Sequence, residues 1–179
     1  MLSDINWKEV EPAGEMLPVG GYVLRIMSAK ETEASGYQMV EIVYDVAEGE
    51  YKGYYFSKKD WMHTMNVFTT DKDGNPQGGF RTFLDFLEKD NPKFKMEKLK
   101  DASQLEGLIF GGCIQKSHYT NQKGEDKYSL KVLKRVSADD IRKGNYEMPE
   151  EDDRRKNKTE ATSAATVTDA DEYTGDVPF

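Results

Sequence analysis

The first part of the chain alternates apolar and polar residues in a way that predicts β-strands. Residues 21–30 and 37–47 both show a period of two, with Ile42 and Tyr44 on one face of the second segment. A short polar turn separates the two segments, which predicts a β-hairpin. Aromatic residues are concentrated in residues 51–57, and this enrichment predicts a third strand there.

A helix is predicted in the middle of the chain. Apolar residues recur at helical spacing from Phe80 to Leu87, and Pro92 lies beyond the point where the helix is expected to end. The preceding segment, residues 58–70, fits a helix or a strand equally well. The polar residues between that segment and the helix predict a loop.

Two further strands are predicted after the helix, over residues 108–119 and 127–136. Gly111 and Gly112 lie inside the first of them, and paired glycines in a strand indicate a bulge or a sharp bend. One short helix is expected over residues 138–142.

Three strands, a helix and two strands form the order of the OB fold, a five-stranded barrel with its helix between strands 3 and 4. We therefore predict a mainly β chain with an N-terminal arm at 1–17, an OB-fold nucleic-acid-binding domain at 18–148 and a flexible, disordered acidic tail at 149–179. Another small α+β domain is the alternative. OB folds bind oligonucleotides, but that analogy needs supporting residues.

Charge is distributed unevenly along the chain. The total of 25 Lys and Arg against 33 Asp and Glu gives a net charge of −8. Residues 159–179 hold five acidic residues and no basic one, whereas residues 107–136 hold six basic residues and two acidic ones. The acidic total therefore does not exclude a nucleic-acid partner, because the excess lies in the tail.

Lysines and aromatic residues gather in the third-strand region and in the last two strands. This combination is typical of single-stranded nucleic-acid binding, because rings stack on exposed bases and cations follow the phosphates. The alternative for each ring is packing in the core, with the lysines facing water. If Tyr54 and Tyr55 lie on a strand, one of them must point away from the interior. The expected contact residues are Lys52, Tyr54, Tyr55, Lys58, Lys59, Trp61, Lys116, His118, Tyr119, Lys123, Lys127 and Lys131.

Signals for catalysis and for metal binding are weak. His63 and His118 are the two histidines, and neither has a second ligand at metal spacing. Cys113 is the one cysteine; it lies in an apolar strand, where a buried packing role is expected, and it excludes an internal disulfide. We expect no enzyme activity, no cofactor and no metal. The sequence holds neither a membrane-length apolar run nor a secretory signal.

The last four residues, Asp176, Val177, Pro178 and Phe179, have the features of a short tethered ligand. The Phe179 ring and its α-carboxylate suit an apolar pocket with a basic rim, and Pro178 limits the entropy lost on docking. The alternative is an accidental apolar terminus.

This end resembles the acidic tip of bacterial single-stranded-DNA-binding proteins (SSB), which usually finish Asp-Asp-Ile-Pro-Phe or Asp-Asp-Leu-Pro-Phe. Asp176, Pro178 and Phe179 match, Val177 is a conservative replacement, and Gly175 stands where a second Asp is usual. The body is similar to a bacteriophage family of small OB-fold proteins. That similarity spans roughly residues 17–136 and lies in Pro18-Val19-Gly20-Gly21-Tyr22, in Val46-Ala47-Glu48-Gly49-Glu50-Tyr51-Lys52-Gly53 and in the helix at Phe80–Leu87.

The resemblance implies a phage protein of DNA replication or recombination, in the cytoplasm of the bacterial host. It would coat single-stranded DNA with little sequence preference and recruit replication or recombination proteins through its tip, with no membrane partner. The number of copies in an assembly stays open. The tail has the same charge sign as DNA and is expected to compete with it. Two alternatives remain: a protein–protein adaptor that binds no nucleic acid, and a nuclease.

Overall fold

The computed structural model describes residues 2–6, 8, 16–57 and 63–155 of the chain. It is mainly β. The strands are β1 (Gly20–Ala34), β2 (Tyr37–Val46), β3 (His63–Thr70), β4 (Ile109–Thr120), β5 (Asp126–Val136) and β6 (Asp152–Arg154). The α-helices are α1 (Gly78–Asp90) and α2 (Ala138–Lys143), and the 3₁₀ helices are η1 (Leu2–Asp4), η2 (Met96–Lys98) and η3 (Ala102–Leu105).

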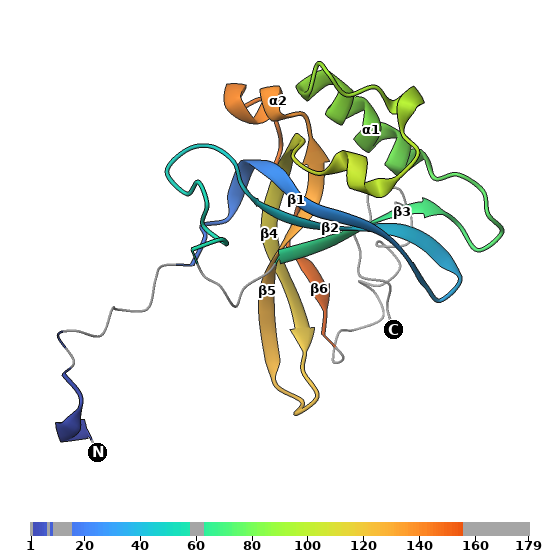
Figure 1. The fold of residues 1–179 in the computed structure, drawn as a ribbon. Coiled ribbons are helices and arrows are strands. Elements are labelled where there is room, and N and C mark those ends of the chain that lie inside the picture. Colours follow the sequence, from blue (N-terminus) through green and yellow to red (C-terminus); the bar gives the residue numbers. More distant parts are fainter. Residues whose placement is uncertain (1, 7, 9–15, 58–62, 156–179) are drawn as a thin grey trace.

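The strands form one six-stranded sheet in the order β3-β2-β1-β4-β5, with β6 paired to β4. The first five strands pair antiparallel, and β6 runs parallel to β4. In the part of the chain that the structure describes, no ladder joins β3 to β5, so the sheet does not close on itself. α1 and α2 lie at one end of the sheet, and the β4–β5 hairpin projects from the opposite end (Figure 1).

The core lies between the curved sheet and α1. Leu24 and Ile42 are fully buried on the inner face of the sheet. Phe83 of α1 packs edge-on against Phe110 of β4, with ring centroids 5.3 Å apart and planes at 90°. This is the apolar stripe that the helical spacing predicts, and it places α1 over the sheet. Leu17, the last residue of the expected arm, is also buried in this core.

The predicted positions of most elements are confirmed, but the predicted position of the third strand is wrong. Residues 51–57 form turns, and β3 instead begins at His63, inside the segment that fitted either helix or strand. Gly49 and Gly53 adopt positive φ angles of 85° and 72°, which turn the chain back towards the sheet. Tyr51, Tyr54 and Tyr55 pack on the core from these turns instead, whereas Phe56 is exposed.

The glycine pair in β4 allows two close approaches. A Cβ on Gly111 would lie 2.6 Å from the backbone oxygen of Ser137, just before α2, and a Cβ on Gly112 would lie 2.6 Å from Cδ1 of Leu24. The β4–β5 register shifts between Cys113 and Ile114, next to this pair. The predicted irregularity thus lies one residue beyond the glycines, where β5 has the extra residue Leu133, while the glycines themselves stay in register and make room for α2 and Leu24.

Replacement of Gly111 by alanine is expected to cost about 2 kcal/mol of unfolding free energy, because the new methyl group overlaps a backbone oxygen that cannot rotate away. Urea unfolding followed by circular dichroism measures this loss. The matched control is Gly78→Ala at the start of α1, where a Cβ meets no atom within 4 Å and stability should stay the same or rise. Equal effects of the two substitutions would contradict the packing argument.

Candidate nucleic-acid interface

The β4–β5 hairpin carries the largest group of expected contact residues. Its base belongs to the core, where Ile114, Leu130 and Val132 are buried. Beyond that base the hairpin extends away from α1 and α2 (Figure 1). Tyr119 and Tyr128 lie on this outer part and are 38% and 42% exposed. The buried base anchors the position of the hairpin, while both rings stay open to solvent.

One face of the hairpin combines a ring with a cation. Lys116 pairs with Leu130 across the strands and His118 pairs with Tyr128, so these side chains share a face. The Lys116 Nζ lies 5.0 Å from the centroid of the Tyr128 ring, and the His118 ring centroid lies 5.9 Å from that ring. The lysine is thus held beside a half-exposed ring, in a cation–π contact.

The opposite face holds the second tyrosine. Tyr119 pairs with Lys127, and Gln115 pairs with Lys131. The pKa of Lys131 is lowered, chiefly by burial and also by Arg154, while Asp152 raises it. Each face of the hairpin therefore presents one tyrosine together with lysine side chains.

The loop at the hairpin tip has a fixed shape. The Asn121 side-chain oxygen accepts hydrogen bonds from the backbone N–H groups of Lys123 and Glu125, at 3.0 and 2.9 Å. Gly124 adopts a positive φ of 79°, which completes the turn. Lys123 therefore has a defined backbone position at the tip, and Lys127 lies 3.5 Å from the Glu125 carboxylate.

The other expected contact residues lie in the connection between β2 and β3. Lys52 is exposed, Tyr54 is half-buried, and Tyr55 is buried with 6% of its surface exposed. The Tyr55 ring lies 3.9 Å from the His63 ring, centroid to centroid, and burial lowers the pKa of His63. Tyr55 is therefore a packing residue here, which does not fit a stacking role. Lys58, Lys59 and Trp61 lie outside the described residues.

This connection is held by one buried carboxylate. Asp45, at the end of β2, accepts hydrogen bonds from the backbone N–H groups of Val46, Tyr55 and Phe56, at 2.7, 2.9 and 3.1 Å. Phe56 is nevertheless 79% exposed. The sequence placed Phe56 among the aromatic residues of a strand but did not single it out as a contact. Its exposure depends on the Asp45 contacts, which no local pattern predicts.

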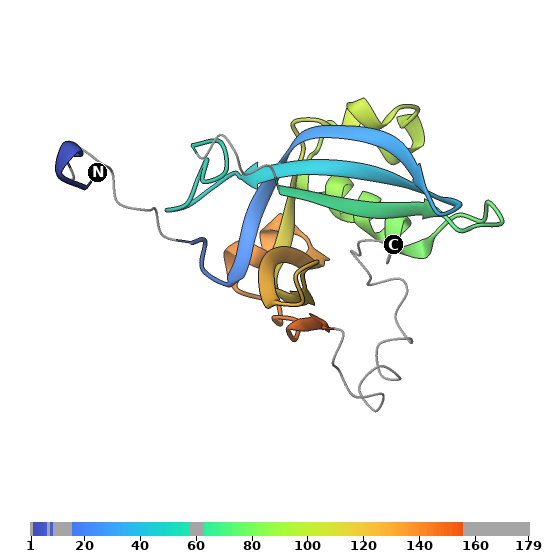
Figure 2. The same cartoon turned by 90° about the horizontal axis from the view of Figure 1, so that it is seen from below.

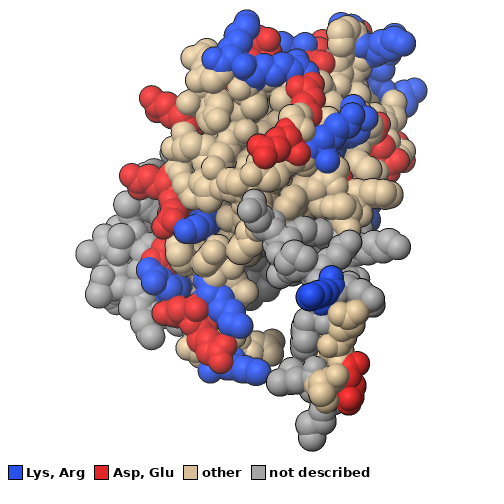
Figure 3. Space-filling model, turned by 90° about the vertical axis from the view of Figure 1, so that its left-hand side faces the viewer, with Lys and Arg blue, Asp and Glu red and all other residues tan. Residues whose placement is uncertain are grey.

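Among the described residues, the two groups of expected contact residues lie in different parts of the molecule (Figures 1 and 2). The described part of the β2–β3 connection, residues 47–57, lies beside the start of β1, whereas the hairpin projects below the sheet (Figure 1). On the face seen in Figure 3, basic side chains alternate with acidic ones and with broad uncharged areas. Arg135 does not add to a basic surface either. It turns inward over the Phe83 ring, 5.5 Å from the centroid, and burial lowers its pKa to about 10.

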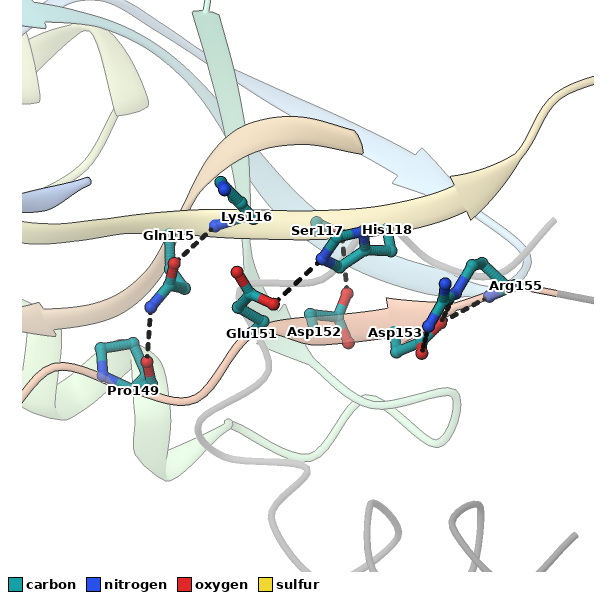
Figure 4. A network of polar contacts seen from close by, with 9 residues as sticks. All are labelled: Gln115, Lys116, Ser117, His118, Pro149, Glu151, Asp152, Asp153 and Arg155. Atoms are coloured by element: carbon teal, nitrogen blue, oxygen red, sulfur yellow. Dashed lines mark hydrogen bonds and ion pairs between the residues drawn. The ribbon is translucent and has the colours of Figure 1, made fainter. Parts of the chain in front are cut away.

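The sequence did not predict that residues 149–155 would pack along the hairpin. Gln115 donates to the Pro149 carbonyl oxygen at 3.0 Å, and the Ser117 hydroxyl donates to Asp152 at 2.7 Å (Figure 4). The His118 ring lies 3.1 Å from the Glu151 carboxylate. The beginning of the segment expected as a flexible tail is thus joined to the sheet through β6.

No group of three or more His, Cys, Asp or Glu side chains in the described ranges is placed to hold a metal ion. The free Cys113 is buried, and burial raises the pKa of its thiol. None of the helices in the described part of the chain has the length and apolar character needed to cross a bilayer.

Loss of the Asp45 carboxylate is expected to destabilise the β2–β3 connection. Asp45→Ala leaves three backbone N–H groups without an acceptor, two of them in buried bonds, and should cost about 3 kcal/mol in urea unfolding. Proteolysis within residues 47–57 should accelerate. Asp71→Ala is the matched control, because Asp71 accepts similar backbone bonds in an exposed loop where water can replace it. Equal losses would show that the burial of Asp45 is unimportant.

A comparison with protein-family models found no match to this chain, and a comparison with curated proteins found no matching relative.

Proposed function

We propose that this protein binds single-stranded DNA through its β4–β5 hairpin. The observation that carries the proposal is the pair of exposed tyrosines, Tyr119 and Tyr128, one on each face of a rigid hairpin that also presents Lys116, Lys127 and Lys131. Base stacking on an aromatic ring contributes about 1–3 kcal/mol per base, whichever base it is. The lysines supply the attraction to phosphates, which is also independent of sequence.

The arrangement of the strands supports an OB-type barrel as the finer description of the fold. The chain has three strands, a helix and two strands in that order, and β1 stands at the centre of the sheet between β2 and β4. OB folds are partly open five-stranded barrels, and the loop between their last two strands contacts nucleic acid. In this chain that loop is the tip of the β4–β5 hairpin, at 121–125.

The adaptor function is the second candidate, and two observations favour it. An adaptor predicts lysines and tyrosines spread over several faces, and the β2–β3 connection and the hairpin do point in different directions. The largely exposed Phe56 also suits a protein partner. DNA binding by the purified protein is the property that separates the two candidates.

The substitution Tyr128→Ala removes the ring and one stacking contact. It should weaken binding to a fluorescein-labelled oligo-dT strand about tenfold in an anisotropy titration. Tyr128→Phe keeps the ring and should bind like the parent protein. Lys116→Ala should weaken binding and reduce the slope of log affinity against log salt by about one.

Tyr37→Ala and Lys72→Ala are the matched controls for this titration. The Lys72 Nζ lies 5.2 Å from the Tyr37 ring centroid, so the same chemistry occurs at the opposite edge of the sheet, on β2 and just after β3. If only Tyr37→Ala and Lys72→Ala weaken DNA binding, the hairpin is not the interface. No preference for single strands over duplex DNA, or no effect of salt, would refute the proposed function. Cleavage of labelled DNA in the presence of magnesium or manganese would indicate the nuclease alternative.

We also propose that the C-terminal tip recruits replication or recombination proteins. Asp176, Val177, Pro178 and Phe179 lie outside the described residues, so the proposal rests on the sequence and on its resemblance to the SSB tip. An acidic segment ending in Pro-Phe suits a partner with an apolar pocket and a basic rim.

Deletion of residues 177–179 should abolish recruitment while DNA affinity stays equal or rises. Immobilised peptides of residues 170–179, with Phe179 or with Phe179→Ala, can be compared for the proteins they retain from a bacterial lysate. Retention of replication or recombination enzymes that needs Phe179 is the expected result. Identical retention by both peptides, or weaker DNA binding by the deletion variant, would contradict this role.

A further inference from the structure

The strap, defined here as residues 147–155, occupies an edge of β4 that β1 leaves open. β1 pairs with β4 only as far as Gly20 opposite Ile114. Further along the same strand, β6 pairs with Ser117, His118 and Tyr119, and these are residues of the projecting hairpin. The strap therefore lies directly against the proposed DNA-binding element, and not against the helical end of the molecule (Figure 1).

The strap and the hairpin have opposite charge. Residues 147–155 contain five acidic residues and two arginines, a net charge of −3. Residues 115–131 contain four lysines and two acidic residues, a net charge of +2. With the strap in place the combined segments are slightly acidic, which opposes the approach of DNA phosphates.

Strap carboxylates reach both faces of the hairpin. Glu151 lies beside His118, on the face that carries Tyr128. Asp152 accepts from the Ser117 hydroxyl on the opposite face, close enough to Lys131 to raise its pKa against the effect of burial. The strap thus places carboxylates beside His118 and Ser117, on the two faces of the hairpin (Figure 4).

The contacts that hold the strap are few and partly exposed. Its ladder with β4 is three residues long. The side chains of the His118–Glu151 hydrogen bond are 24% and 50% exposed, and even a full ion pair at such a site contributes little to stability. Asp152 and Asp153 are also paired within the strap, to Arg154 and Arg155 at 2.8 and 2.6 Å. Release of the strap therefore leaves these two carboxylates with a partner.

We propose that the strap competes with DNA phosphates for the β4–β5 hairpin and is displaced from the edge of β4 when single-stranded DNA binds. This inference rests on the proposed DNA-binding function. It assigns the competition to described residues that contact the hairpin, and it is separate from any effect of the terminal tip.

Removal of strap charge in direct contact with the hairpin should tighten DNA binding. Glu151→Gln is expected to raise the affinity for labelled oligo-dT about threefold at low salt, the upper range for an exposed ion pair. Glu150→Gln is the matched control: it removes the same charge one residue away, on an exposed side chain outside the strap–hairpin contacts described above. Equal effects of the two would indicate general charge repulsion, and weaker binding by Glu151→Gln would show that the strap supports the site; both results overturn the proposal.

A second variant locks the strap in place. Ser117 and Asp152 are register partners, so the double variant Ser117→Cys, Asp152→Cys can form a disulfide across β4 and β6, while the native Cys113 stays buried. The oxidised protein should bind oligo-dT about tenfold more weakly than the same protein after reduction, and equal affinities would refute displacement. If the parent protein binds DNA but neither test shows an effect, this inference fails alone. If the parent protein does not bind DNA, the proposed function fails with it.

Discussion

The structure depends on the pairing of β4, because two different strands, β1 and β6, pair along the same edge of it. β5 runs along the other edge for almost the whole length of β4, from Gly111 to Thr120. On the shared edge, β1 pairs with the half of β4 that lies in the core, and β6 pairs with the half that projects beyond it. An isolated two-stranded hairpin is marginal in water, and this one is anchored to the core at its base through Ile114, Leu130 and Val132. The constraint explains how a few exposed side chains keep defined positions far from the core.

The same pairing shows why the net charge of the chain is a poor guide to its partners. Basic residues are concentrated in the hairpin, and the acidic segment that follows the fold begins with a strand that lies on that hairpin. Charges of both signs therefore meet at one place instead of forming separate surfaces. Arg135 belongs to the basic segment in sequence yet points into the interior, so a count along the chain overstates the charge available to a ligand.

Local patterns predicted the elements whose side chains alternate between core and solvent. The spacing from Phe80 to Leu87 located α1, and the alternation before and after the glycine pair located β4 and β5. The third strand was misplaced because Tyr51, Tyr54 and Tyr55 pack on the core from turns, and aromatic enrichment does not distinguish the two arrangements.

The candidate site was predictable only in part, for a related reason. Tyr119 and the hairpin lysines could be found from residue type and alternation. β6 could not, since three residues with the sequence Asp-Asp-Arg carry no apolar period and pair with a strand more than 30 residues earlier in the chain. The conformation of such a segment is determined by its hydrogen bonds to distant parts of the chain.

The parallel pairing of β6 with β4 also determines where the chain leaves the sheet. Because β6 runs the same way as β4, it ends at Arg154, opposite Tyr119, and the chain leaves the sheet towards the hairpin tip. An antiparallel strand at the same edge would have released the chain near the helices. The direction of this three-residue strand therefore determines that the chain after β6 starts from the hairpin end of the molecule.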